Sequence, residues 1–185
     1  MSTALWLLAL LGVVGAFDTL YFHEWRGQLV ARPDMRPELR LHVARDAIYV
    51  IVFATLPLVA WHGWFTAALA LLLLAEIVIT LADFVTEDRV RTAIGGVFPG
   101  ERITHAIMGI IYGAMLAYLT PTLWQWAQEP TGITGAPHQV PATVTWGLVL
   151  MAAGILLHGL RDLYAVLGMP GSNWPWPPAP ATSPS

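Results

Sequence analysis

The sequence predicts an all-α integral membrane protein, built as one bundle of five transmembrane helices. The 185 residues are 56% hydrophobic, and the mean hydropathy is +0.61. Charged residues make up only 11% of the chain, whereas a soluble domain carries about 25%. Five apolar segments follow one another, and each approaches the roughly 20 residues that a spanning helix needs.

The five predicted spans are separated by connections of different kinds. The spans cover residues 4–22, 47–61, 65–84, 103–124 and 145–166. The first has no basic segment before it and no small-residue cleavage site after it, so we expect a retained span rather than a signal peptide. Pro33 and Pro37 end one helix and begin the next. The short segment 61–64 is a tight turn that makes spans two and three antiparallel neighbours.

The remaining segments are connections and a tail. Glycines and Pro99 separate spans three and four, and residues 128–143 form a neutral loop rich in turn residues. The proline content after residue 168 is incompatible with a helix. We therefore expect a transmembrane domain over residues 1–168 and a Pro-rich tail over residues 169–185.

Arginine predicts the orientation. The chain has nine arginines and no lysine. Five arginines lie in the first connection, three in the third and one near the end of the fifth span, while the other two connections have none. The positive-inside rule then places the N-terminus outside and the C-terminus inside. We expect a multi-pass protein of a bacterial-type cytoplasmic membrane.

Acids and histidines gather in the inner half of these spans. Of the twelve acids only Glu129 falls on the outer side, and of the six histidines only His62 and His138 do. In span three, four polar residues recur at i, i+4, i+7 and i+11, from Glu76 to Glu87, and share one helical face. A carboxylate exposed to lipid is expensive, so these faces are predicted to meet inside the bundle.

This gathering predicts a metal centre. Imidazole and carboxylate ligands without thiolate suit iron, manganese or zinc, and the chain has no cysteine. Di-iron bundles collect such ligands from four facing helices, although the spacing here is i, i+4 rather than the usual i, i+3. The candidate metal ligands are His23, His42, Asp46, Asp83, Glu87, Glu101 and His105.

Glu76 and His158 are the deepest polar pair and the candidate catalytic residues. An isolated charge at that depth is costly, so we expect the two to contact each other directly or through one water or metal. They would then pass protons to the metal site. Structural ion pairing, without any reaction, is the alternative for the whole cluster.

Other polar and small residues have simpler interpretations. Glu24, Asp34, Glu38 and Asp88 are expected to be solvated loop charges or partners of arginines, and Asp162 could pair with an arginine. His62 is interpreted as an outer interface residue and His138 as a loop residue. Gly109 and Gly113 fit a small-xxx-small pattern for close helix packing.

These observations favour a membrane oxidoreductase with a dinuclear centre, iron being the preferred metal, that acts on a hydrophobic or membrane-borne substrate. Two alternatives stay open. One is a haem b- or quinone-linked electron-transfer subunit with two histidines as axial ligands. The other is a non-catalytic structural or assembly subunit, or a small proton-coupled transporter. The expected partners are the lipid bilayer, a redox partner or larger membrane complex, and further copies of the chain. No basic tract suggests nucleic acid.

The orientation can be tested with a topology reporter. A reporter fused after Ser185 should behave as cytoplasmic, because the arginine-rich connections are predicted to lie inside. A periplasmic signal from that fusion would overturn the assignment of inner and outer ends.

Overall fold

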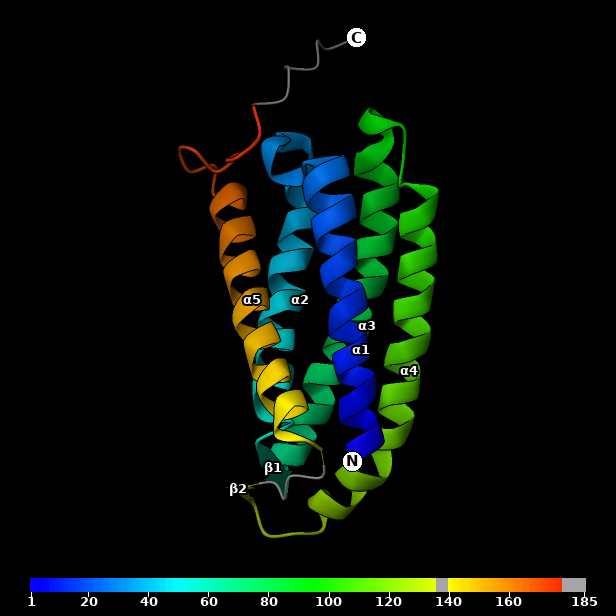
Figure 1. Ribbon diagram of the computed structural model, residues 1–185, viewed down its shortest axis with the longest axis vertical. Coiled ribbons are helices and arrows are strands. Elements are labelled where there is room, and N and C mark those ends of the chain that lie inside the picture. The colour runs from blue at the N-terminus through cyan, green and yellow to red at the C-terminus, as the bar shows by residue number, and fades with distance from the viewer. Residues whose placement is uncertain (136–139, 178–185) are drawn as a thin grey trace.

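A computed structural model describes residues 1–135 and 140–177. Five long helices lie lengthwise beside one another in a bundle (Figure 1). They are α1 (Ser2–Asp18), α2 (Arg36–Thr55), α3 (Trp64–Val90), α4 (Pro99–Ala127) and α5 (Ala142–Val166). The mostly helical bundle expected from the sequence is confirmed.

Four helical segments are long and apolar enough to cross a membrane, which makes this a membrane-type helical bundle. They are Ser2–Ala31, Trp64–Ile94, Pro99–Ala127 and Ala142–Val166. The helix in the second position differs from the predicted span 47–61, because α2 begins eleven residues earlier, at Arg36. Its first half carries Arg40, Arg45 and Asp46, among other charges, which lowers its hydropathy.

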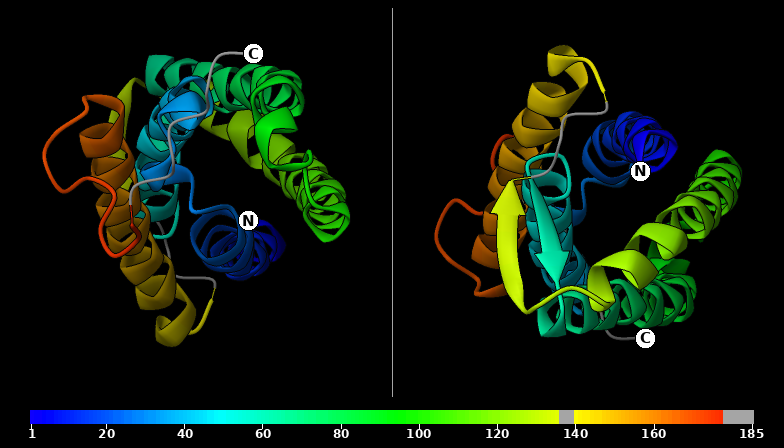
Figure 2. Two further views of the ribbon diagram at one scale, coloured as in Figure 1. Left: turned by 90° about the horizontal axis from the view of Figure 1, so that it is seen from above. Right: turned by 90° about the horizontal axis from the view of Figure 1, so that it is seen from below.

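The charged half of α2 is tolerated because of where the helix lies. α2 packs most extensively against α5 and then against α3. Seen from above, α5, α2, α3 and α4 form a curved layer, and α1 lies across its open side (Figure 2). α1 itself packs against α4 and α5. Glu38, His42 and Asp46 of α2 are therefore buried against other helices, as the sequence predicts for the polar stripes, whereas Arg40 is exposed.

The chain after α1 keeps turning but changes its helical pitch. Residues Thr19–Gly27 form a π-helix, η1, which ends at Gln28 in a left-handed conformation. Two short 3₁₀ turns, η2 (Leu29–Ala31) and η3 (Pro33–Met35), lead into α2. Pro37 lies in the first turn of α2, where its missing N–H costs nothing, so the predicted role of the prolines is confirmed.

A small two-stranded sheet lies at the end of the bundle away from η1 and the start of α2 (Figure 1). β1 (Val59–His62) pairs antiparallel with β2 (Gly132–Gly135), with Val59 opposite Gly135 and His62 opposite Gly132. The His62 ring lies 2.8 Å from the Thr134 hydroxyl, so it fastens the two strands. The turn predicted over residues 61–64 is confined to Gly63, because Trp61 and His62 belong to β1 and Trp64 begins α3. The strands themselves were not expected from the sequence. His138 lies outside the described residues.

The core divides into an apolar half and a polar half. The apolar half lies toward β1 and β2, and its fully buried side chains come from all five long helices: Leu8, Phe53, Leu69, Met115, Leu119 and Leu148. The polar half lies where α1 passes into η1 and where η4 (Arg91–Ile94) follows α3. The apolar half holds the helices together, and the polar half contains the candidate site.

The described part of the tail, residues 169–177, folds back onto the polar end. Arg161 pairs with Glu24 and donates from Nη2 to the Trp174 carbonyl over 2.8 Å. The Trp176 indole N–H donates to Glu24 over 3.3 Å. Glu24 is thus a partner of an arginine, as expected, and this part of the tail contains no long helix.

The turn before α3 should depend on glycine. Gly63 has φ +57°, and an added Cβ would approach the backbone nitrogen of Thr131 to 2.8 Å. Gly63→Ala should therefore destabilise the fold by about 1–3 kcal/mol, measured as the free energy of unfolding in detergent. Gly135→Ala is the control, because a Cβ at that strand position meets nothing within 4 Å. Equal stability of the two variants would contradict this interpretation.

Candidate metal centre

The polar half buries far more negative than positive groups. Eight carboxylates are buried: Asp18, Glu38, Asp46, Glu76, Asp83, Glu87, Glu101 and Asp162. Among the arginines, all of which lie in residues 1–135 and 140–177, only Arg91 is buried. Carboxylates in a dry interior must be paired, protonated or bound to metal. Three buried histidines, His23, His42 and His105, lie among them.

Arg91 is the centre of the ion-pair network. Its Nη1 donates to both oxygens of Glu101, over 2.6 and 2.8 Å, and its Nε donates to both oxygens of Glu38, over 3.0 and 3.1 Å. A third nitrogen, Nη2, also contacts Glu38. The guanidinium therefore ties α2 to α4 from the end of α3. Glu38 is a partner of an arginine, but the expectation that it would be solvated is wrong, because it is fully buried.

The π-helix places the first group of candidate ligands. Asp18 and His23 are five residues apart, which on an α-helix would separate them by about 140° around the axis. The i to i+5 repeat of a π-helix brings such residues together. Here Asp18 Oδ2 lies 3.3 Å from His23 Nε2 and also 3.3 Å from His105 Nε2 of α4. Asp18, His23 and His105 thus converge from two segments of chain.

Two further carboxylates border this group. Glu101 Oε1 lies 3.1 Å from His23 Nε2, and Glu87 Oε1 lies 3.5 Å from His105 Nδ1. Glu87, Glu101 and His105 also bring one ligand atom each within 4.8 Å of one another. The ring of Phe84 stacks on His105 at 5.2 Å and fixes its plane.

His42 is the centre of a second group. Its Nε2 lies 3.3 Å from Asp83 and 3.6 Å from Glu38, and its Nδ1 lies 3.6 Å from Asp162. The rings of His23 and His42 stack at 4.8 Å with an interplanar angle of 9°. His23, Glu38 and His42 form one of the convergent triplets, so the two groups adjoin at His23.

These separations match the spacing of neighbouring ligands around one metal ion. Two atoms that are each about 2.1 Å from a metal lie roughly 3.0 Å apart at a right angle and roughly 3.4 Å apart at a tetrahedral angle. Several of the converging nitrogens make no hydrogen bond to the described residues: His23 Nε2 and both nitrogens of His42. Both oxygens of Asp162 also lack a hydrogen bond, as does the second oxygen of Asp18, Asp83 and Glu87, which is not the oxygen that makes the contacts above. The donor set therefore fits a metal.

The predicted metal ligands fall into two sets. His23, His42, Asp83, Glu87, Glu101 and His105 belong to the connected cluster described above. Asp46 instead accepts a 2.9 Å hydrogen bond at Oδ2 from His158 Nδ1 and takes part in no convergent triplet. It is positioned by Gly159, where an added Cβ would lie 3.1 Å from the Asp46 Cβ.

The predicted direct contact between Glu76 and His158 is wrong. Glu76 accepts hydrogen bonds from the Tyr49 hydroxyl over 2.6 Å and from the Thr80 hydroxyl over 2.8 Å. His158 pairs with Asp46. The physical reason is the position of α2 between α3 and α5, because α2 supplies the intervening side chains.

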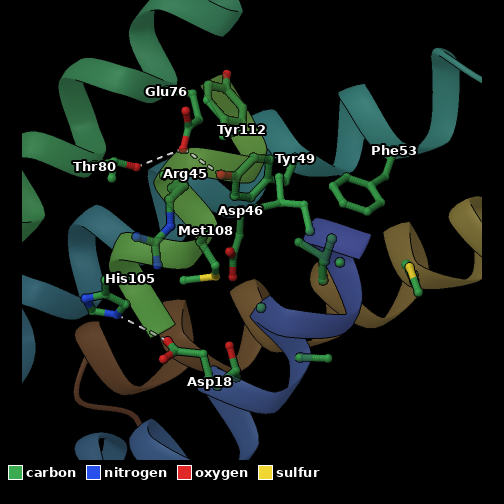
Figure 3. Close-up of a pocket in the computed structure, with 18 of the residues that line it drawn as sticks. Asp18, Arg45, Asp46, Tyr49, Phe53, Glu76, Thr80, His105, Met108 and Tyr112 are labelled. Carbon is green, nitrogen blue, oxygen red and sulfur yellow. Dashed lines mark hydrogen bonds and ion pairs between the residues drawn. The ribbon is translucent and has the colours of Figure 1, made fainter. Parts of the chain in front are cut away.

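A cavity of about 590 Å³ adjoins the cluster, and all five long helices line it. Figure 3 shows Asp18 and His105 at one side of the cavity, and Arg45, Tyr49 and Glu76 at another. Asp46 and His158 also line it. The cavity therefore connects the candidate metal ligands with the interior of the bundle.

The glycines of α4 border this cavity rather than a helix contact. A Cβ added at Gly109 or Gly113 would meet nothing within 4 Å. The expected close packing through the small-xxx-small pattern is therefore wrong, and the missing side chains leave open space instead.

Four residues of the cluster received no ligand role in the sequence analysis: Asp18, Glu38, Arg91 and Asp162. Asp18 requires the π-helix, which the sequence pattern did not reveal. Glu38 is one helical turn before His42, and Arg91 is one turn after Glu87, so both continue a polar stripe. Extending the stripes by one turn would have found these two. Asp162 lies beside the two histidines of α2 and α5 and pairs with no arginine in the described chain.

Comparison with family models, with curated proteins and with solved structures found no match to this chain. The interpretation of the site therefore depends on its geometry.

The Arg91 network should be essential to the fold. Arg91→Met leaves two buried carboxylates unpaired, which should cost about 3–5 kcal/mol in the free energy of unfolding. Arg102→Met is the matched control, since it removes an exposed pair with Asp88 and should cost at most about 1 kcal/mol. If both variants unfold at the same denaturant concentration, Arg91 does not hold the polar end together.

Proposed function

We propose that this protein is a membrane oxidoreductase with a dinuclear metal centre of histidines and carboxylates, preferably of iron, at one end of the helical bundle. The substrate is hydrophobic and comes from the membrane. The observation that carries the proposal is the convergence of imidazole nitrogens and carboxylate oxygens at ligand spacing, directly beside a cavity. Structural pairing alone explains this less well, because one nitrogen of His23, both nitrogens of His42 and both oxygens of Asp162 make no hydrogen bond to the described residues.

The geometry suggests two adjoining metal positions. Asp18, His23 and His105 surround the first, with Glu87 and Glu101 beside them. His42 and Asp83 border the second, on the other side of His23. Dinuclear sites hold their ions about 3.5–4 Å apart, and Glu38, which converges with both His23 and His42, would supply a carboxylate near both positions.

The charge balance supports bound cations. Eight buried carboxylates face one buried arginine in the described chain, and Arg45 adds a second, half-buried cation that pairs with Asp83 over 2.9 Å. Two divalent ions would supply four positive charges. The donors are nitrogen and oxygen only, a set that suits iron, manganese or zinc. Zinc has no redox chemistry, whereas iron and manganese can change their oxidation state when bound by such ligands, and iron is our preferred choice of the two.

The haem alternative fits the geometry less well. Two axial histidines approach haem iron from opposite faces, with their nitrogens directed at each other. His23 and His42 instead stack face to face. A haem would also leave the surplus of carboxylates unexplained.

The proposal includes the arrangement in the membrane. All five long helices would span the bilayer, with α2 shielded by α3 and α5. The N-terminus would lie outside and the C-terminus inside, in a bacterial-type cytoplasmic membrane, as the arginine distribution favours. The metal centre would then lie near the cytoplasmic face, where a redox partner can supply electrons.

Metal analysis of the purified protein tests the proposal. We expect about two metal ions per chain, mainly iron, measured by plasma mass spectrometry. His105→Ala and His42→Ala should each lower this content, because each removes a nitrogen ligand from one group. His62→Ala is the control, since this histidine lies at the opposite end of the bundle and contacts Thr134.

Two results would contradict the proposal. One is wild-type protein, purified without chelator, that contains no transition metal. The other is an intense Soret absorption band, which would show haem instead of a carboxylate-bound metal pair. Full metal content in both His42→Ala and His105→Ala would contradict the ligand assignment.

A further inference from the structure

The cavity beside the candidate metal ligands has mostly apolar walls with polar groups among them. Leu11, Phe53, Ile77, Leu116 and Ile155 contribute apolar surface. Its polar lining includes Asp18, Arg45, Asp46, Tyr49, Glu76 and His158. At about 590 Å³ it lies within the range of roughly 300–1,000 Å³ that small-molecule sites occupy. An occupant would therefore carry one polar group on an apolar body.

The charges in the cavity lining favour an uncharged head group. Asp18, Asp46 and Glu76 border the cavity and would repel a carboxylate, while an ammonium group beside Arg45 would be repelled by the guanidinium and could accept no hydrogen bond from it. Arg45 donates to Asp83 through Nη1, and its other nitrogens have no acceptor in the described part of the chain. The cavity is therefore lined both by hydrogen-bond donors, from Arg45, and by acceptors, from the carboxylates.

A hydroxyl group matches both kinds of partner. It can accept from the guanidinium of Arg45 and donate to a carboxylate such as Glu76 or Asp18. A carbonyl can only accept, and an alkane would leave the buried polar groups without a partner. The lining thus distinguishes an alcohol from the corresponding acid, amine and alkane.

Glycines connect the cavity to the outer surface of the bundle. Gly109 and Gly113 of α4 and Gly154 of α5 line the cavity, are exposed, and would meet nothing within 4 Å if they carried a Cβ. α4 and α5 are the helices against which α1 packs. In a membrane, this exposed surface faces lipid, so an apolar molecule can enter beside α1 without passing through water.

We propose that the cavity binds a lipophilic alcohol, a single apolar chain or ring system with one uncharged hydroxyl head, which enters from the bilayer and places its hydroxyl beside Arg45 and one carboxylate of the lining. This assignment names the substrate class of the metalloenzyme proposed above and rests on that function for its catalytic meaning. The binding itself requires only the cavity.

Photolabelling in lipid nanodiscs tests the assignment. The probe is hexadecan-1-ol with a photoreactive diazirine in its chain, and labelled peptides are identified by mass spectrometry. We expect saturable labelling of α1 and α4. Unlabelled hexadecan-1-ol should compete at concentrations about tenfold below those of hexadecanoate, hexadecylammonium or hexadecane, because only the alcohol satisfies both kinds of partner.

Variants at the glycines test the place of binding. Gly113→Leu fills the cavity from α4, and Gly109→Leu does so one turn away. Each should weaken labelling about tenfold or more while the metal content stays at the wild-type value. Gly147→Leu is the matched control on α5, because a Cβ there also meets nothing within 4 Å but the residue does not line the cavity.

Two results with the wild-type protein alone would overturn the assignment. One is labelling that does not saturate, and the other is competition by hexadecanoate that is as strong as competition by the alcohol. Wild-type labelling in both Gly109→Leu and Gly113→Leu would also overturn it. The two proposals fail separately. Saturable labelling of metal-free protein supports the alcohol site even where no metal is found. Bound metal without saturable labelling contradicts the alcohol site alone.

Discussion

The buried Arg91 guanidinium is the interaction on which the polar half of the bundle depends. It lies in η4, directly after α3, and joins Glu38 of α2 to Glu101 of α4, so these helices are held at one buried point. It also satisfies only two of the eight buried carboxylates. Glu76, Asp46 and Asp83 have other partners, but Asp18, Glu87 and Asp162 contact only histidines, and that convergence indicates where cations would balance the cost of their desolvation.

The change from α-helix to π-helix connects this electrostatic constraint with the candidate chemistry. It places His23 on the same face of the helix as Asp18, and Asp18 also contacts His105 on α4. Insertions of this kind occur often at functional sites. The same stretch of chain lines the cavity, so one local change of pitch brings candidate ligands to the wall of a space that a membrane-borne molecule could occupy.

Much of the fold could be predicted from composition and periodicity, because a chain with few charges must turn its polar stripes inward in lipid. The stripe on α3 from Glu76 to Glu87 and the pair of Glu101 and His105 were predictable for this reason. The start of α2 was not, since its charged first half resembles a loop until α3 and α5 are seen to cover it. Contacts between helices, such as that of Glu76 with Tyr49, depend on which helices are neighbours, and periodicity contains no information on that.

The proposed pair of metal ions lies between the histidines of η1, α2 and α4. Anomalous X-ray diffraction from crystals of the protein as purified, measured on both sides of the iron absorption edge, can locate these ions. We expect two anomalous peaks about 3.5–4 Å apart beside His23, one toward His105 and one toward His42. The absence of peaks at this place in metal-replete crystals, or a single peak within a porphyrin ring, would contradict the proposal.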